Sequence, residues 1–227
     1  MKKAFTMIEL IFIIVVVGIL AAVAVPQINR NSLVEAADQI TAHIRYTQQL
    51  AMNDNKFNAN DPNWFRRLWR IQFTNQGAPG SAAGWRYNVY WDNGRFPGSN
   101  GQPNNLNSIA DDPQNPNKLL TSGFARQPAN ANGARMNKKL NLGGSYDIVN
   151  VAFGPACNQG GNTTIAFDSK GRPMRQVANV PLYANLIIAP CTITLTNSAN
   201  ENAIITIQPE TGYVNYTLAS NTGPGGQ

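Results

Sequence analysis

The 227-residue sequence predicts an α+β fold in which a long N-terminal α-helix packs on an antiparallel β-sheet or two-sheet domain. Three observations predict it. An apolar segment opens the chain, an amphipathic segment follows it, and short runs rich in β-branched and aromatic residues fill the remainder. A chain of this length holds one ordinary globular domain plus an extra segment.

The apolar segment is long enough to cross a bilayer as a helix. An unbroken run of sixteen apolar or glycine residues, LIFIIVVVGILAAVAV, occupies positions 10–25. From Phe5 to Val25 a helix would measure roughly 31 Å, close to the hydrocarbon thickness of a membrane. Lys2 and Lys3 precede the run and predict a cytoplasmic N-terminus, with the rest of the chain outside the cytoplasm. No second such run occurs, which excludes a multi-span transporter.

Three interpretations of this segment are open. The two lysines, the apolar core and the small residues of AVA at 22–24 suit a secretory signal peptide. A plain signal anchor would use the same run. In the third interpretation, a short basic peptide is removed before the apolar run instead of after it. Glu9 favours the third, because a carboxylate at the bilayer centre costs about 2.5–3.5 kcal/mol and brings a signal peptide or an anchor no benefit.

A cut after Ala4 would give Glu9 a partner. The new amino group on Phe5 would lie four residues before Glu9, so that in a helical array Glu9 of one subunit neutralises the amine of its neighbour. On residues 4–10, AFTMIEL, the chain resembles the processing and methylation motif of the type IV pilin and pseudopilin superfamily. The resemblance implies that a prepilin peptidase cleaves between Ala4 and Phe5 and methylates Phe5. Alanine stands where the family usually has glycine.

The resemblance also implies an assembly role for the helix. In the family, the stretch that here runs from Gly18 to Pro26 unwinds when subunits pack into filaments. Both residues suit that change, because glycine has backbone freedom and proline lacks an N–H. The implied organisation is a leader at 1–4, a transmembrane and filament-core helix at 5–26, an amphipathic helix at 27–53 and a periplasmic β-rich domain at 54–227.

Apolar residues recur every three or four positions after Pro26 and predict the amphipathic helix. They are Leu33, Ala36, Ala37, Ile40, Ile44, Leu50 and Ala51. Joined to the apolar segment, this pattern predicts one helix from Phe5 to Met52, roughly 70 Å long. His43 is the only histidine. Because no carboxylate or cysteine cluster lies near it in the sequence, we interpret it as a partly exposed helix residue.

Beyond residue 53 the pattern is that of strands. Residues 68–73 and 85–91 predict an aromatic hairpin with one face on the helix and one in solvent. Stacking of its rings on single-stranded nucleic acid is the less favoured interpretation. Further strands are predicted at 147–153, 163–168, 184–188, 192–196, 203–208 and 213–218. Two turns, DSKG at 168–171 and PETG at 209–212, end in glycine, which supplies the positive φ of a tight turn.

Residues 93–137 are dominated by Asn, Gly, Pro and Gln and predict a long surface insertion with a short helix or strand near 118–120. Long ordered loops often carry function, so this insertion is the best candidate for partner contact. Three aspartates in this region, Asp92, Asp111 and Asp112, raise the question of calcium. No acidic loop of fixed spacing contains them, and no metal or cofactor is expected.

The two cysteines, Cys157 and Cys191, are an even number in a part of the chain predicted to face an oxidising compartment. They predict a disulfide, with two buried free thiols as the alternative.

Most of the chain carries a second resemblance. The aromatic hairpin, the segment IAFDSKGR at 165–172 and residues 204–207 with the PETG turn resemble the minor pseudopilin H and FimT group. The group implies two antiparallel sheets packed against the helix. It also implies a minor pilin or pseudopilin of a type II secretion pseudopilus or type IV pilus-like filament. Implied partners are other pilin subunits, the prepilin peptidase and an assembly platform of the inner membrane, where the subunit resides before it enters a periplasmic filament.

Two other functions are weighed against this one. Some FimT-like proteins bind DNA in natural transformation through a basic motif near the C-terminus. Here residues 212–216 read GYVNY, and the basic residues Arg172 and Arg175 lie at the earlier turn instead. The mild excess of basic residues beyond Lys3 is scattered and matches ordinary solubility. An enzyme is not expected, because a serine–histidine–acid set could form only around His43.

Overall fold

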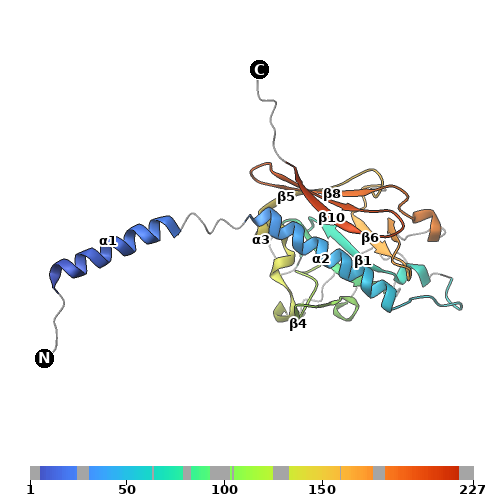
Figure 1. Cartoon of the computed structure of the whole chain (residues 1–227). Helices are drawn as coiled ribbons and strands as arrows, with labels where there is room; N and C mark the ends of the chain where they lie inside the picture. The colour runs from blue at the N-terminus through green and yellow to red at the C-terminus, as the bar shows by residue number, and fades with distance from the viewer. Residues whose placement is uncertain are drawn as a thin grey trace, which may run out of the picture. The chain divides into compact units, whose positions relative to one another are not determined.

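The computed structural model describes residues 6–24, 31–62, 64–78, 83–92, 103, 105–124, 133–158, 160–175 and 182–219 (Figure 1). The chain divides into two compact units, Met1–Asn31 and Ser32–Gln227. The first unit contributes one described helix, and the second contributes the other helices and the β-strands. This arrangement confirms the α+β class with antiparallel sheets.

Helix α1 (Met7–Ala24) has 18 residues and carries Glu9 in its first turn. The side chains described for this unit, residues 6–20, are all exposed within it. A search of the described residues finds no helix with the length and hydropathy that a membrane crossing requires.

The expected single helix from Phe5 to Met52 is not confirmed. Asn31 is not helical, and a separate helix, α2, spans Ser32–Asn53. Residues 25–30, with Pro26, lie outside the described residues. A sequence-level reason for two helices is that proline lacks the N–H of a helical hydrogen bond and disfavours the α conformation of the residue before it.

Helix α2 is amphipathic, as its spacing predicts. The apolar residues of its buried face are Leu33, Ala36, Ala37, Ile40, Ile44 and Ala51. Leu50, the remaining member of the predicted stripe, is partly buried and packs against the same core. This face lies against strands of both larger sheets.

Two four-stranded antiparallel sheets form within the described part of the second unit. The first has the order β2-β1-β6-β7, and the second β10-β9-β8-β5. The first sheet consists of β1 (Trp69–Thr74), β2 (Arg86–Trp91), β6 (Thr164–Phe167) and β7 (Pro173–Arg175). The second consists of β5 (Ile148–Phe153), β8 (Cys191–Asn197), β9 (Asn202–Ile207) and β10 (Val214–Ala219).

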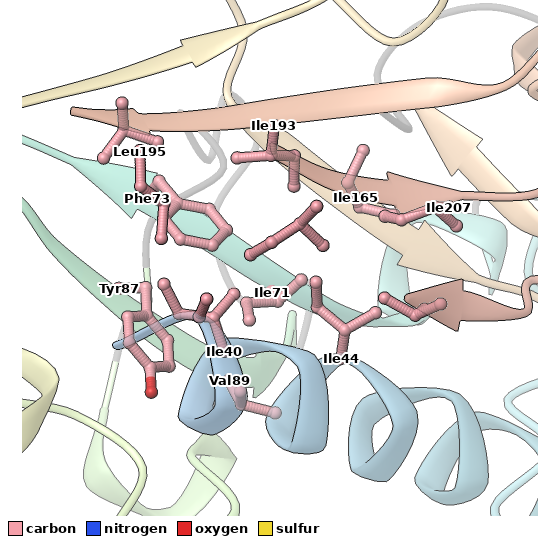
Figure 2. Close-up of a cluster of buried hydrophobic side chains, with 14 of the residues drawn as sticks. Ile40, Ile44, Ile71, Phe73, Tyr87, Val89, Ile165, Ile193, Leu195 and Ile207 are labelled. Carbon is pink, nitrogen blue, oxygen red and sulfur yellow. The ribbon is translucent and has the colours of Figure 1, made fainter. Parts of the chain in front are cut away.

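The main core lies where the two sheets and α2 meet, and Figure 2 shows their side chains pointing toward one another. Ile40 and Ile44 come from α2, Ile71 and Phe73 from β1, and Ile193 from β8; each is at most 1% exposed. In the second sheet, buried and partly exposed residues alternate along β8 and β9. That sheet therefore has one face in the core and one facing solvent.

The first sheet is buried on both faces, so the solvent face expected for its aromatic hairpin is wrong. Residues such as Arg70, Asn88 and Tyr90 point away from α2 yet are at most 3% exposed. Segments from elsewhere in the chain cover them. A cluster around Leu68 and Met174 includes the 3-10 helix Trp64–Arg67, and a further cluster joins Tyr90 to the region after it. The rings of Trp69, Phe73, Tyr87 and Tyr90 are therefore enclosed, whereas Trp85 and Trp91 are partly exposed.

The described part of the 93–137 insertion lies partly at the surface and partly in the domain: residues 113–117 and 133–135 are exposed, whereas 108–110 and 119–124 are buried. It holds β3 (Asp111–Asp112) and β4 (Asn115–Leu119), which pair with each other. Of the short helix or strand expected near 118–120, the structure has the strand. Ile109, Leu119 and Phe124 are at most 5% exposed and pack around Tyr90 of β2.

The other predicted strands are confirmed to within two residues at each end, except the one at 184–188. There the chain forms the 3-10 helix Leu182–Asn185 followed by a single bridge between Leu186 and Met174. The short helix α3 (Leu142–Tyr146) and the 3-10 helices Leu106–Ser108, Gly133–Arg135 and Lys138–Leu140 complete the described elements.

Candidate functional site

The predicted processing and assembly residues fall in the first unit. Ala4, Phe5 and Pro26 lie outside the described residues. Glu9 and Gly18 lie on α1, and the backbone N–H of Glu9 donates to the carbonyl of Thr6 over 3.1 Å. A methyl group added at Gly18 would meet no atom within 4 Å, so within the described chain no neighbour requires glycine there.

Helix α1 exposes a large apolar surface. Its exposed large apolar side chains are Met7, Ile8, Leu10, Ile11, Phe12, Ile13, Ile14, Val15, Val16, Val17, Ile19 and Leu20. Burying such a side chain stabilises by about 1.5–3 kcal/mol, which gives roughly 18–36 kcal/mol for these twelve side chains. Moving one carboxylate into the same apolar surrounding costs about 3 kcal/mol on a membrane-insertion scale. Burial of α1 in an apolar surrounding therefore remains strongly favourable despite Glu9.

The two glycine turns meet at one side chain of α2. The Gln48 amide Nε2 donates to the carbonyl of Gly171, in the turn after β6, and to the carbonyl of Thr211, in the turn before β10; both distances are 2.8 Å. Gly171 and Gly212 have φ of +78° and +64°, as the turn prediction requires. Gln48 thus ties the helix to both sheets at a single point.

We expect Gly212→Ala to lower the free energy of unfolding by about 2 kcal/mol, because a left-handed residue with a Cβ is strained. An added Cβ would also lie 2.5 Å from Gln48 Nε2 and 2.6 Å from the Gly171 carbonyl oxygen. Denaturant unfolding measures the change. Gly77→Ala is the matched control, since nothing lies within 4 Å of its added methyl group. Equal stability of the two variants would contradict the turn contact.

The expectation that His43 is partly exposed is wrong. Its side chain is buried, and its Nδ1 lies 2.7 Å from the hydroxyl of Tyr87. That hydroxyl accepts from Gln39 Nε2 over 2.7 Å, and it donates its own hydrogen to Nδ1 when the imidazole carries its proton on Nε2. Gln39 Oε1 in turn accepts from the hydroxyl of Tyr146 over 2.8 Å.

Burial lowers the pKa of His43 from 6.5 to about 4, and the charge of Asp112 opposes this shift in part. Burial likewise raises the pKa of Tyr87, and that of Tyr146 to about 12. At neutral pH the network is therefore uncharged: a neutral imidazole, two protonated phenols and an amide. It serves to satisfy polar groups beneath α2, since a buried polar group without a partner is costly.

Arg172, proposed from the sequence as a DNA contact, is engaged within its own turn. Its Nε and Nη2 donate to Asp168 Oδ2 over 2.8 and 2.7 Å, and its guanidinium lies 5.2 Å from the ring of Tyr183. The hydrogen bond to Asp168 raises the pKa of Arg172. Arg175, on β7, is half-buried. A role of these two arginines in DNA binding stays a prediction.

Cys157 and Cys191 form the predicted disulfide, with their Cα atoms 5.3 Å apart. Both residues are fully buried. The bond fastens the turn after β5 to the start of β8, beside a backbone hydrogen bond from Gly154 to Thr192 of 2.8 Å.

The three aspartates considered for calcium have separate roles. Asp111 pairs with Arg135 over 2.9 Å. Asp112 is buried and accepts from Asn137 Nδ2 over 2.7 Å, and Asp92 is buried at the end of β2. No group of three or more His, Cys, Asp or Glu that would hold a metal occurs among the residues described.

Sequence reasoning missed two of these features, the Gln48 contact and the buried histidine network. Each joins α2 to residues more than 40 positions away, so no local spacing reveals it. One signal in the sequence was available: Gln39, His43 and Gln48 all flank the apolar stripe of α2. Comparison with protein-family models, with curated proteins and with solved structures found no match for this chain.

Proposed function

We propose that the chain is a minor pilin or pseudopilin, a structural subunit of a type II secretion pseudopilus or type IV pilus-like filament. A prepilin peptidase removes residues 1–4, and the subunit waits in the inner membrane with its domain in the periplasm. Its partners are other pilin subunits and the assembly platform. Its role is in the assembly of the filament, through contacts between subunits.

The observation that carries this proposal is a single carboxylate, Glu9, at the start of an otherwise apolar and exposed helix. A protein keeps a charge in such a place only where a counter-charge meets it. The amine that cleavage would create on Phe5 supplies one. The described α1 does not reach the length of a span by itself, and the membrane stage of the proposal rests on the sequence from Phe5 to Val25.

The fold supports the proposal in a second way. In the second unit the strands and turns leave the outer face of α2 uncovered, with Glu35, Asp38 and Arg45 at a polar pocket there. The described β domain is stabilised by its own core and a disulfide. Such a domain is suited to be carried on a filament, where α1 makes the subunit contacts and the domain presents its surface.

Intact-mass analysis of the membrane-extracted protein tests the proposal. We expect a product that begins at methylated Phe5. An Ala4→Gly variant, which restores the residue usual in the family, is expected to be processed at the same bond and at least as fast. A product beginning at Val25 would mean cleavage after the AVA of residues 22–24 and would contradict the proposal.

Glu9→Gln is the matched variant for assembly, because it removes the charge and keeps the size of the side chain. We expect it to leave the β domain folded and to abolish incorporation into filaments purified from cells. Normal incorporation of this variant would show that the carboxylate does not pair with a neighbouring subunit.

A further inference from the structure

A pocket on the second unit combines cationic and polar side chains with small and apolar residues in its lining. Its lining residues come from the end of β4, from residues 133–141 and from α3, and it has a volume of about 900 Å³. Three lysines line it: Lys118, Lys138 and Lys139. The volume lies within the roughly 300–1,000 Å³ of sites that take small molecules.

No carboxylate balances these lysines in the wall of the pocket. All twelve acidic residues of the chain belong to the described part, and none of them lines it. The nearest acidic pair in the sequence, Asp111 and Asp112, is already bound to Arg135 and to Asn137. Lys139 lies 3.9 Å from Glu35, at the outer limit of an ion pair, and its side chain remains 66% exposed. Lys118 and Lys138 therefore bring positive charge that no carboxylate in the wall balances.

A buried hydroxyl gives a second, independent indication of a ligand. Ser122 lines the pocket and is only 5% exposed, yet its Oγ has no hydrogen-bond partner among the described residues. Buried hydroxyls are normally satisfied, and an unsatisfied one is costly. The Lys118 ammonium is held at the same wall by the carbonyl of Ala134, 2.5 Å away, which leaves it further hydrogens to donate.

The type of cationic side chain in the lining indicates which kind of anion the pocket binds. Arginine, whose planar fork matches a carboxylate, does not occur in the described lining, and all three charges are ammonium groups. Ammonium groups act as point charges that can gather around a tetrahedral anion, and lysine is a common phosphate binder. A phosphoryl group fills only a small part of this volume, and the organic body that carries it would meet the polar side chains of Asn137, Asn141 and Ser145.

We propose that this pocket binds a phosphate ester on a polar organic body, with Lys118, Lys138 and Ser122 donating to the phosphoryl oxygens. The inference does not depend on the proposed function, because it uses no residue of α1.

The test is titration calorimetry of the full chain with glucose 6-phosphate, with glucose as the control. We expect saturable binding of the ester and none of glucose. Lys138→Gln is expected to weaken binding by about fivefold, as for an exposed charge pair. Lys170→Gln is the matched control, since it also removes one exposed lysine but lies on the turn after β6, outside this lining. It is expected to bind as the wild type does.

Ser122→Ala separates a binding role from a structural one. Because the hydroxyl has no partner among the described residues, the variant is expected to unfold at the same or a higher denaturant concentration and to bind about threefold to tenfold more weakly. A variant that loses stability and keeps its affinity would overturn the assignment of Ser122.

A lipid headgroup could supply the same phosphate ester. Sedimentation with phosphatidylcholine vesicles, with and without phosphatidic acid, tests that source, and only the difference between wild type and Lys138→Gln counts because α1 is common to both. A pocket-dependent effect in either assay supports the proposal and identifies the source. Absence of a Lys138 effect in both assays would overturn it.

Discussion

Replacing Cys157 and Cys191 together by alanine is expected to lower the free energy of unfolding by about 4 kcal/mol. The two cysteines are 34 positions apart, so the bond removes the closure entropy of a loop of that size from the unfolded chain. For a domain of this size, a loss of this magnitude corresponds to a fall of roughly 8–16 °C in the melting temperature. Guanidinium and thermal unfolding under oxidising conditions measure it.

Reduction of the wild-type protein provides the control for the disulfide. Reduced wild type is expected to lose a similar amount of stability, because the bond is broken while both sulfur atoms remain. Each single cysteine variant should match the double variant, since one substitution already abolishes the bond. If oxidised wild type and the double variant unfold at the same temperature, the bond does not contribute to stability.

Acidification from pH 7 to pH 4 is expected to lower the free energy of unfolding by about 3 kcal/mol through His43 alone. The pKa of His43 is about 4 in the folded state, against 6.5 in its ordinary state. Between these values the unfolded chain binds a proton that the folded chain does not. The stability that the neutral His43 contributes is therefore fully present above pH 6.5 and is lost as the pH falls toward 4.

Between pH 7 and pH 5 the contribution of His43 to the pH dependence can be measured by itself. The chain has no other histidine, and carboxylates with ordinary pKa values stay ionised above pH 5. Between pH 7 and pH 5 we expect a loss of about 2 kcal/mol in wild type. His43→Gln has no group that titrates there and should show a nearly flat profile in urea unfolding. An equal slope in the two proteins would mean that His43 does not cause the pH dependence.

Elements that depend on local spacing could be predicted from the sequence. Periodicity predicts the apolar stripe of α2 and the positions of β1, β6 and β8 along the chain. The conformational freedom of glycine predicts the two glycine turns. The cysteine count predicted the disulfide. For the candidate assembly site, the sequence supplied Glu9 and its apolar surroundings, and the partner that the carboxylate needs belongs to another subunit in the proposal.

The sequence by itself thus determined the apolar α1 with its single carboxylate, the order of the strands and their turns. Only the tertiary structure decided that His43 is buried, that the first sheet has no solvent face and that Gln48 joins two turns. The physical reason is distance along the chain. Period-two and period-3.6 patterns report which side of one element is apolar, whereas these three features depend on segments far apart in sequence that meet only when the domain has packed.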